Sequence, residues 1–306
     1  MERKLIYLIN PISGTGGKTS LQQLLTQRTE EAGIAYSIHP TSIDGNYDFL
    51  RALIEKEKVT DIVVCGGDGT VSAVMAALVG SPIRVGVIPM GSGNGLAFAA
   101  KIPKDPGKAL DIIFAGKASS IDGFLINGQY SCMLCGIGFD GQVAHEFAIQ
   151  PKRGLETYAR VTLKNFFTAR TYPFRITIPA QGNGGSLNFP VNAFFINIAN
   201  GDQFGNHFTI APKASLQDGM LDIVIVKKKR GRLGFILSVI RQVLGGYPVQ
   251  EHPGDDRRRS ILYFRTPSLE IANPEYAPVH IDGDPGAPAS NFIVKIVPNA
   301  IQLIQP

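Results

Sequence analysis

Cysteines and long apolar runs are scarce in this sequence. The chain has three cysteines, an odd number among 306 residues, which argues against a disulfide framework and favours a reducing compartment. No segment approaches the roughly 20 apolar residues that a membrane-spanning helix needs. The apolar run at residues 5–9 is too short for a secretory signal. We therefore expect a cytoplasmic protein without a membrane span.

Several other signals are missing. The 34 glycines follow no three-residue period, which excludes collagen, and no internal repeat is present. The five histidines lack metal-ligand spacing. Cys132 and Cys135 form a single CxxC in an apolar segment, where buried small side chains are expected rather than zinc or redox chemistry. No nucleic-acid recognition motif or aromatic platform occurs, so we expect no nucleic-acid partner.

The residues that are present are typical of a globular protein. Hydrophobic residues make up 44% and charged residues 18% of the chain. A prior of about 150 residues per domain suggests two domains. The net charge of +5 favours anionic partners.

The first 120 residues alternate between short apolar runs and helix-like segments. The runs predict strands at residues 4–9, 34–38, 61–65 and 85–88. Helices are predicted at residues 18–32, 47–56, 71–78 and 107–115, the last with Asp105 as N-cap and Pro106 at the first helical position. This alternation indicates an α/β domain with a parallel sheet covered on both faces.

From about residue 119 many short strands replace this pattern. Asn127 and Gly128 predict a hairpin turn, since both tolerate positive φ. Further strands are predicted at residues 174–178, 191–199, 221–226, 261–265, 269–271, 279–281 and 292–297, and helices at 155–167 and 233–244. The predicted organisation is therefore an α/β domain at residues 1–120 followed by a β-rich domain, an antiparallel sandwich or barrel, at residues 121–290.

Three glycine-rich segments follow predicted strands of the first domain, at residues 10–18, 66–70 and 91–95. Loops at the carboxyl ends of parallel strands converge on a crevice where ligands bind. Glycine lets the backbone approach a ligand closely, and N–H groups at helix N-termini attract anions. We therefore expect a phosphate-bearing ligand at these turns.

Two familiar phosphate motifs do not match. Gly17, Lys18 and Thr19 resemble the end of a P-loop, but Ile12 stands where that motif requires glycine. Residues 136–141 have GxGxxG spacing, yet they lie in the β-rich half without the strand that a dinucleotide fold needs. Spacing alone is weak evidence, so we assign no dinucleotide site there.

Asp68 is the most informative residue of these segments. A carboxylate between glycines would repel a phosphate unless a bound Mg²⁺ bridges the two groups. Asp68 also suits the N-cap of the helix that follows it. The two roles are compatible, and capping alone does not explain two neighbouring glycine turns.

Together these motifs resemble the catalytic domain of the diacylglycerol kinase and sphingosine kinase family, with the bacterial soluble lipid kinases nearest in size and layout. The ordered set covers nearly the whole chain: Asn10–Gly14, Gly66–Thr70, Gly91–Ala97, Gly136–Asp140, Asn200–Gly201, Phe204–Gly205, Ala211–Ala214, Asp218–Asp222 and Asp282–Asp284. The resemblance implies a three-layer α/β nucleotide domain and a β-sandwich domain with the active site between them. It also implies that the last strand, within residues 291–306, returns to the first domain.

The resemblance further implies an ATP-dependent lipid kinase that uses Mg²⁺. The positions that would hold the nucleotide are Asn10, Thr41, Gly66, Gly67, Asp68, Gly69, Thr70, Ser92 and Asn94. Asp68 would lie near the phosphates and Mg²⁺ and take part in catalysis.

Two acidic segments acquire roles in the same way. Family members commonly carry Asp-Gly-Glu, with the glutamate as general base, where this chain has Asp282, Gly283 and Asp284. The shorter Asp284 serves as the base if its backbone lies closer to the acceptor hydroxyl, and a plain turn is the alternative. Asp218 and Asp222 resemble the family's structural Mg²⁺ site, with an acidic turn as the alternative.

A lipid kinase must reach a bilayer. The basic residues 227–230 and Arg232 precede the predicted helix at 233–244, whose apolar face fits either an interfacial anchor or a core contact. Lys152, Arg153 and residues 257–259 add basic charge. We expect a lipid substrate at an anionic membrane surface, with transient peripheral association. A homodimer is left open.

Three functions compete. The first is transfer of the ATP γ-phosphate to a hydroxyl of a diacylglycerol-like or sphingoid lipid. The second is an NAD kinase-like activity, because NAD kinases share the motif at residues 66–70. The third is a nucleotide-binding regulator with little turnover, motivated by Asp284. The segments Asn10–Gly14 and Gly91–Ala97 favour the lipid kinase.

Overall fold

A computed structural model describes residues 2–9, 18–42, 44–152, 154–180, 185–203, 211–227, 249–250 and 260–306. Two units make up the chain: unit 1 is Met1–Asp122 with Asn299–Pro306, and unit 2 is Gly123–Pro298. The chain passes between them twice, within the strands β5 (Ala118–Ile126) and β16 (Asn291–Ile304). The return to unit 1 begins at residue 299 rather than 291, because the first residues of β16 pair within unit 2.

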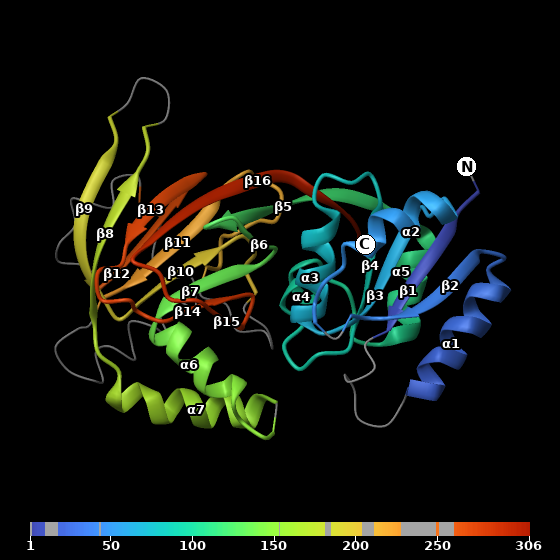
Figure 1. Cartoon of the computed structure of the whole chain (residues 1–306), viewed down its shortest axis with the longest axis horizontal. Helices are drawn as coiled ribbons and strands as arrows, with labels where there is room; N and C mark the ends of the chain where they lie inside the picture. The colour runs from blue at the N-terminus through green and yellow to red at the C-terminus, as the bar shows by residue number, and fades with distance from the viewer. Residues whose placement is uncertain are drawn as a thin grey trace. The chain divides into compact units, whose positions relative to one another are not determined.

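Unit 1 contains a parallel sheet with the strand order β2-β1-β3-β4 (Figure 1). Its strands are β1 (Lys4–Ile9), β2 (Ala35–Pro40), β3 (Asp61–Gly66) and β4 (Arg84–Pro89). The C-terminal end of β16 pairs with β4, also in parallel. Every residue of β3 is buried, as expected for an isoleucine- and valine-rich strand covered on both faces.

Three helices connect these strands, namely α1 (Lys18–Glu31), α2 (Phe49–Glu57) and α3 (Asp68–Leu78), and two more follow β4, namely α4 (Gly95–Ala99) and α5 (Pro106–Ala115). The chain moves from β1 to β2 in one direction and from β2 through β3 to β4 in the other. Right-handed crossovers therefore place α1 on one face and α2 and α3 on the opposite face. Helix α5 packs against α1, and α2 packs against α3. Unit 1 thus has the three layers expected from the sequence.

Strand order reverses between β1 and β3, the neighbours at the centre of the sheet. In open parallel sheets, ligands bind outside the carboxyl ends of the strands at such a reversal. The segments that leave β1, β3 and β4 all start at this edge, which we call the carboxyl edge.

Unit 2 is built on two antiparallel sheets. One sheet has the order β12-β11-β10-β7-β14-β15, and the other has β16-β13-β8-β9, with the hairpin of β5 and β6 (Gln129–Ser131) beside β16. The remaining strands are β7 (Leu134–Gly138), β8 (Tyr172–Ile178), β9 (Leu187–Ala193), β10 (Phe195–Ala199), β11 (Leu221–Val226), β12 (Ile261–Thr266), β13 (Ser268–Ala272), β14 (Val279–Ile281) and β15 (Asp284–Gly286).

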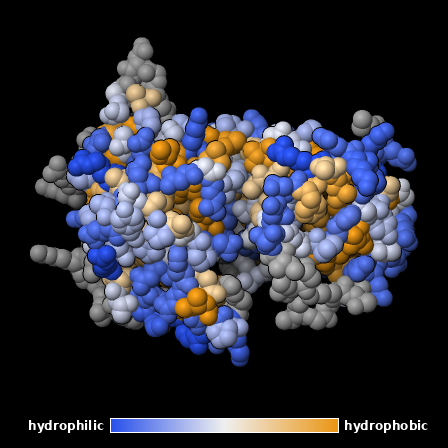
Figure 2. All heavy atoms as spheres, viewed as in Figure 1, coloured by the Kyte–Doolittle hydropathy of each residue, from blue (hydrophilic) through white to orange (hydrophobic). Residues whose placement is uncertain are grey.

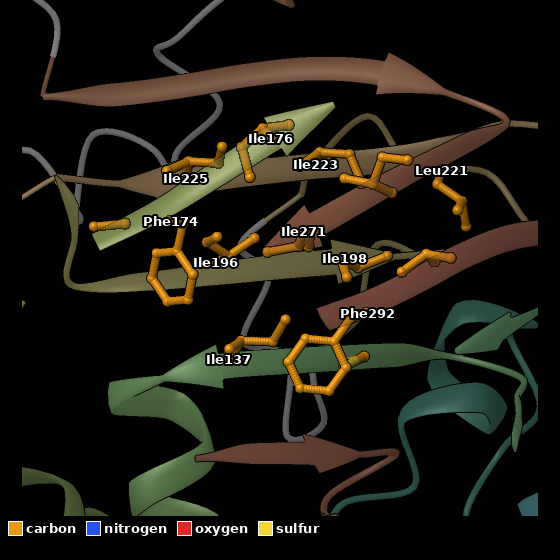
Figure 3. Packing of buried hydrophobic residues seen from close by; sticks show 14 of the residues in the cluster. Ile137, Phe174, Ile176, Ile196, Ile198, Leu221, Ile223, Ile225, Ile271 and Phe292 are labelled. Carbon is orange, nitrogen blue, oxygen red and sulfur yellow. The ribbon is translucent and has the colours of Figure 1, made fainter. Parts of the chain in front are cut away.

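The core of unit 2 lies between these sheets. Ile196, Ile198 and Ile223 from one sheet share a buried cluster with Phe174 and Ile271 from the other (Figure 3). Alternate residues of β11 point to the opposite face of the sheet, so Val224 and Val226 belong to a second buried cluster, against which the partly buried Phe139 and Phe166 pack. These two phenylalanines lie on α6 (Phe139–Ala148) and α7 (Leu155–Thr168), which cover that outer face.

Most predicted elements are confirmed, including the four parallel strands and the hairpin at Asn127 and Gly128, whose φ angles are 48° and 84°. The single strand predicted at residues 191–199 is wrong. The chain breaks at Phe194, and β9 and β10 on either side of it belong to different sheets. Helix α6 was not predicted, because its glycine-rich start resembles a loop.

Large hydrophobic side chains that reach solvent lie in separate segments of the described chain, for example Phe49, Ile149 and Leu163. Figure 2 shows several hydrophobic areas among hydrophilic residues on the visible face. Single exposed hydrophobic residues are normal on protein surfaces. None of the helices within the described residues is long and apolar enough to span a bilayer.

Candidate functional site

The carboxyl edge of unit 1 gathers the glycine-rich segments that the sequence singled out. Residues 66–70 lead from β3 into α3, and residues 90–95 lead from β4 into α4. Because β3 and β4 are hydrogen-bonded neighbours, these two turns lie side by side. Residues 10–17 follow β1 and include the predicted nucleotide residue Asn10, which lies outside the described residues.

The two described glycine turns touch through their backbones. A Cβ atom added to Gly91 would lie 2.7 Å from the Cα of Gly67, and one added to Gly67 would lie 3.1 Å from the Cα of Gly91. A side-chain carbon at Gly91 would force the backbone of the neighbouring turn to shift, and one at Gly67 would make a tight contact with it. This packing accounts for the two glycines before any ligand is considered.

The Asp68 carboxylate joins the same two turns. Asp68 is the first residue of α3, and Gly67 is the N-cap, so Asp68 does not cap its own helix as the sequence suggested. Its Oδ2 accepts the N–H of Asn94 and its Oδ1 accepts the N–H of Gly95, both at 2.7 Å. These donors lie at the start of α4, where a negative charge is favourable. The carboxylate therefore holds the turn after β4 against the turn after β3.

Asn94 shapes the second turn with its side chain. The residue is buried and has a left-handed backbone, with φ 54°. Its Oδ1 accepts the N–H of Gly91 at 2.8 Å, and its Nδ2 donates to the Gly91 carbonyl at 2.7 Å. The side chain predicted to hold nucleotide is thus engaged in closing the turn.

The remaining predicted nucleotide residues lie around this pair of turns. Thr70 is in the first turn of α3 and packs over Gly66, where an added Cβ would lie 2.8 Å from the Thr70 Cβ. Ser92 is exposed in the turn after β4. Thr41 follows β2 and is buried, with its N–H donated to the Ile9 carbonyl at 3.1 Å. The structure brings Gly66, Gly67, Asp68, Gly69, Thr70, Ser92 and Asn94 together, and places Thr41 at the same edge of the sheet.

In unit 2, Asp282 anchors the turn that carries the predicted base. Its carboxylate accepts the N–H groups of Cys132, Met133 and Leu134, each at 3.0 Å. The Ser131 hydroxyl donates to the same carboxylate at 2.8 Å. Asp282 is therefore a structural residue, because its carboxylate oxygens accept hydrogen bonds from the segment that joins β6 to β7.

Asp284 is presented differently. Asp282 and Gly283 form the two-residue connection between β14 and β15, and their φ angles of 49° and 90° are those of a type I′ turn. Asp284 is the first residue after this turn, opposite Ile281, and it is exposed. Of the two aspartates, Asp284 is the one whose position suits contact with a substrate.

The predicted metal residues Asp218 and Asp222 share a guanidinium group. Arg265 places its Nε 3.2 Å from Asp222 Oδ1 and a terminal nitrogen 3.4 Å from Asp218 Oδ2. Tyr263 also donates its hydroxyl to Asp222 Oδ1, at 2.5 Å. Burial raises the pKa of Asp222, although Tyr263 and Arg265 act in the opposite direction.

This geometry does not fit Asp218 and Asp222 as joint ligands of a magnesium ion. Asp222 is fully buried, and the positive charge between the two carboxylates is that of Arg265. No group of three or more acidic, histidine or cysteine side chains within the described ranges is arranged to hold a metal. Arg265 was not singled out by the sequence, since it lies on β12, far along the chain from both partners.

The isolated CxxC is buried, as expected. Cys132 and Cys135 are free cysteines, and burial raises the pKa of the Cys135 thiol well above its ordinary value. Such a thiol stays protonated and unreactive. Most of the basic residues considered for membrane contact, namely 153, 228–230, 232 and 257–259, lie outside the described residues, as does the predicted helix at 233–244.

Comparison with known families covers both units. Residues 4–126 match the diacylglycerol kinase catalytic domain, and residues 134–305 match the YegS C-terminal NAD kinase beta sandwich-like domain. The second match alone spans more than half of the chain. The chain belongs to this family of lipid kinases. It is therefore an enzyme, an ATP-dependent kinase, and the resemblance stated from the sequence is confirmed.

Relatives in the family are similar over most of their length. A diacylglycerol kinase of Bacillus subtilis (strain 168) is 29% identical over 287 residues, which cover 92% of this chain and 89% of that protein. A probable lipid kinase, YegS-like, of Chromohalobacter salexigens is 25% identical over 285 residues, 91% of this chain and 86% of that protein. A solved diacylglycerol kinase from Bacillus anthracis str. Sterne has a TM-score of 0.72 at 21% identity, covering 100% of this chain and 97% of that one, which shows a shared fold.

Proposed function

We propose that this kinase transfers the γ-phosphate of ATP to a hydroxyl of a diacylglycerol-like or sphingoid lipid, with ATP bound as its Mg²⁺ complex. The observation that carries the proposal is the Asp68 carboxylate, which ties two glycine turns together at the carboxyl edge of a parallel sheet. Such an edge is where α/β sheets bind phosphates. The names of the relatives support the lipid as acceptor.

The phosphates would lie against the start of α3. Backbone N–H groups and the positive end of an eleven-residue helix favour an anion at this position. Asp68 lies at the same place, and a carboxylate oxygen can accept more than one bond. Asp68 would help to hold a Mg²⁺ at this place, and the ion would offset the repulsion between carboxylate and phosphate. Asn10, Thr41 and Ser92 would hold the rest of the nucleotide.

Asp284 would act as the general base. The lipid hydroxyl oxygen attacks the γ-phosphorus, the bond from that phosphorus to the bridging oxygen breaks, and ADP leaves as the phosphate ester forms. Asp284 takes the proton of the hydroxyl. An exposed carboxylate on a turn anchored by Asp282 suits this task, because its backbone is fixed.

The kinase would meet its lipid at an anionic membrane surface. The net charge is +5, and basic residues gather in the sequence at 227–232 and 257–259. Each lysine or arginine near such a surface contributes about 1 kcal/mol of attraction at moderate ionic strength. We infer a transient, peripheral association.

An NAD kinase-like activity is the second candidate, favoured by the description of the family that matches residues 134–305. One assay separates the candidates. The protein is incubated with γ-labelled ATP and Mg²⁺ in separate reactions, each of which contains one acceptor: diacylglycerol, sphingosine, ceramide, phosphatidylglycerol or NAD. We expect the wild type to form labelled lipid. The Asp284→Ala variant should form it at least about 100-fold more slowly, as expected for loss of a general base.

Two outcomes would contradict the proposal. Label on NAD alone would identify the NAD kinase-like activity. Binding of ATP without any labelled product would identify a regulator. Asp105→Ala is the matched control for the aspartate variants, because Asp105 caps α5 by accepting the Lys108 N–H and lies outside both glycine turns.

A further inference from the structure

A buried histidine lies next to the turn that carries Asp284. His280 is the middle residue of β14 and is 1% exposed. It pairs with Gly136 on β7 on one side and with Pro285 on β15 on the other. The sequence alone predicts no role for this histidine, because it is a single histidine in an apolar strand.

The His280 ring reaches the turn itself. Its Nδ1 accepts the backbone N–H of Gly283 at 3.2 Å. A ring nitrogen that accepts a hydrogen bond carries no proton, so in the neutral ring the proton is on Nε2. This bond holds the peptide unit between Asp282 and Gly283, and Asp284 is the next residue along the chain.

The other side of the ring faces a carboxylate. Asp140, the second residue of α6, places its Oδ2 3.3 Å from His280 Nε2. The two atoms lie at ion-pair distance without a hydrogen bond between them, so it is the negative charge of Asp140 that favours a proton on Nε2, the form of the ring in which Nδ1 is the acceptor. A Cβ atom on Gly136 would overlap both Asp140 Oδ2 and His280 Nε2, so this glycine leaves room for the pair.

We propose that His280 is a positioning residue for Asp284, and that Asp140 orients His280 for this role. The chain of contacts runs from Asp140 through the ring to Gly283, and from there to Asp284. Asp282 anchors the first residue of the turn, and His280 anchors the second. The inference rests on the proposed role of Asp284 as general base, since a base must stay within hydrogen-bond reach of the hydroxyl that it deprotonates.

Two substitutions at one position separate the two contacts of the ring. In His280→Asn, an amide oxygen can occupy the place of Nδ1 and accept the Gly283 N–H, while the contact with Asp140 is lost. In His280→Gln, the amide reaches the place of Nε2 and Asp140, while the Gly283 bond is lost. His145→Gln is the matched control, because His145 bonds the Val279 carbonyl from α6 at 3.0 Å and does not bond to the turn.

The experiment measures kcat and the KM for ATP with dioleoylglycerol in detergent micelles, together with hydrogen exchange of the Gly283 amide. We expect His280→Gln to lower kcat about tenfold or more with the KM for ATP unchanged, and to speed exchange at Gly283. His280→Asn and His145→Gln should keep kcat within about threefold of the wild type.

Equal kcat values for the asparagine and glutamine variants, or unchanged exchange at Gly283 in His280→Gln, would overturn the positioning role. Asp284→Ala, run alongside, distinguishes this failure from that of the proposed function. If Asp284→Ala keeps wild-type kcat, the base itself is wrong and the inference falls with it. If Asp284→Ala is inactive while the two His280 variants are equal, only the positioning role is wrong.

Discussion

The aspartates of this chain have different structural and functional roles. The sequence shows which of them are candidates for function more readily than it shows the role of each. Asp68 and Asp284 stand in glycine-rich segments, which is why they were predicted to be functional. The anchoring role of Asp282 depends on N–H groups near residue 132, far away in the sequence. The partners of Asp222 are equally distant along the chain, on β12. Contacts between distant segments leave no local spacing in the sequence, so these roles required the structure.

The ionisation of Asp222 should be visible in the pH dependence of stability. Burial raises the pKa of Asp222 above its ordinary value of 3.8, so folding disfavours the ionised form. A raised pKa contributes stability that is present below the ordinary value and is lost as the pH rises through the folded value. As the pH rises above the ordinary value of 3.8, the unfolding free energy of the wild type should fall relative to that of Asp222→Asn, by at most about 1.4 kcal/mol per pH unit for one proton.

Urea titrations of both proteins over this range provide the measurement. Asparagine keeps a side-chain oxygen that can accept the Tyr263 hydroxyl, so the variant changes the charge more than the packing. Parallel stability curves for the two proteins would show that Asp222 ionises as readily in the folded chain as in the unfolded one.

At the scale of elements, the parallel sheet of unit 1 could be predicted because β1, β3 and β4 are buried on both faces and their sequences are short apolar runs. The same reasoning failed at residues 191–199. The mostly apolar segment 191–199 carries no turn signal at Phe194, where the chain leaves one sheet and enters the other. Helix α6 begins after Gly138, whose φ is 96°, and glycine-rich starts of this kind carry no helical periodicity. The packing of one glycine turn on the other could not be predicted either, since the sequence shows only that both turns are rich in glycine.

That packing predicts a strong effect of a single methyl group. Gly91→Ala would place a Cβ 2.7 Å from the Cα of Gly67 and 3.0 Å from the Asn94 side-chain oxygen. We expect the unfolding free energy to fall by about 1–3 kcal/mol, the usual cost of overpacking, and the affinity for Mg-ATP to fall with it.

Urea unfolding and nucleotide titration of Gly91→Ala test this, with Gly185→Ala as control. An added Cβ at Gly185 meets no atom within 4 Å, so that variant should change stability by less than about 0.5 kcal/mol. Wild-type stability and nucleotide affinity in Gly91→Ala would mean that the two turns are not in contact.

At the scale of the whole molecule, two units of different architecture are linked by two strands that take part in both. Composition and motif order were enough to predict this division, because parallel and antiparallel sheets have different sequence patterns. The excess of basic residues also belongs to this scale, since its effect is on encounter with a charged partner rather than on the fold.

Binding to vesicles should therefore depend on lipid charge and on salt. We expect binding to vesicles that contain phosphatidylglycerol, weak binding to neutral phosphatidylcholine vesicles, and loss of most binding between about 0.05 and 0.5 M salt as screening increases. The double variant Lys228→Glu/Lys229→Glu should lower the fraction of protein that sediments with the vesicles. This decrease should be larger than that caused by the same double change at the exposed residues Lys56 and Lys108. Equal binding to neutral vesicles at high salt would contradict an electrostatic association.

The most direct test of the central claim is titration calorimetry of the folded protein with Mg-ATP. If Asp68 and the two glycine turns form the nucleotide site, the wild type and the Asp105→Ala control bind Mg-ATP, and Asp68→Ala binds at least about tenfold more weakly, which corresponds to 1.4 kcal/mol. A folded wild type that gives no binding heat at any temperature tested, or an Asp68→Ala variant with unchanged affinity, would contradict the account.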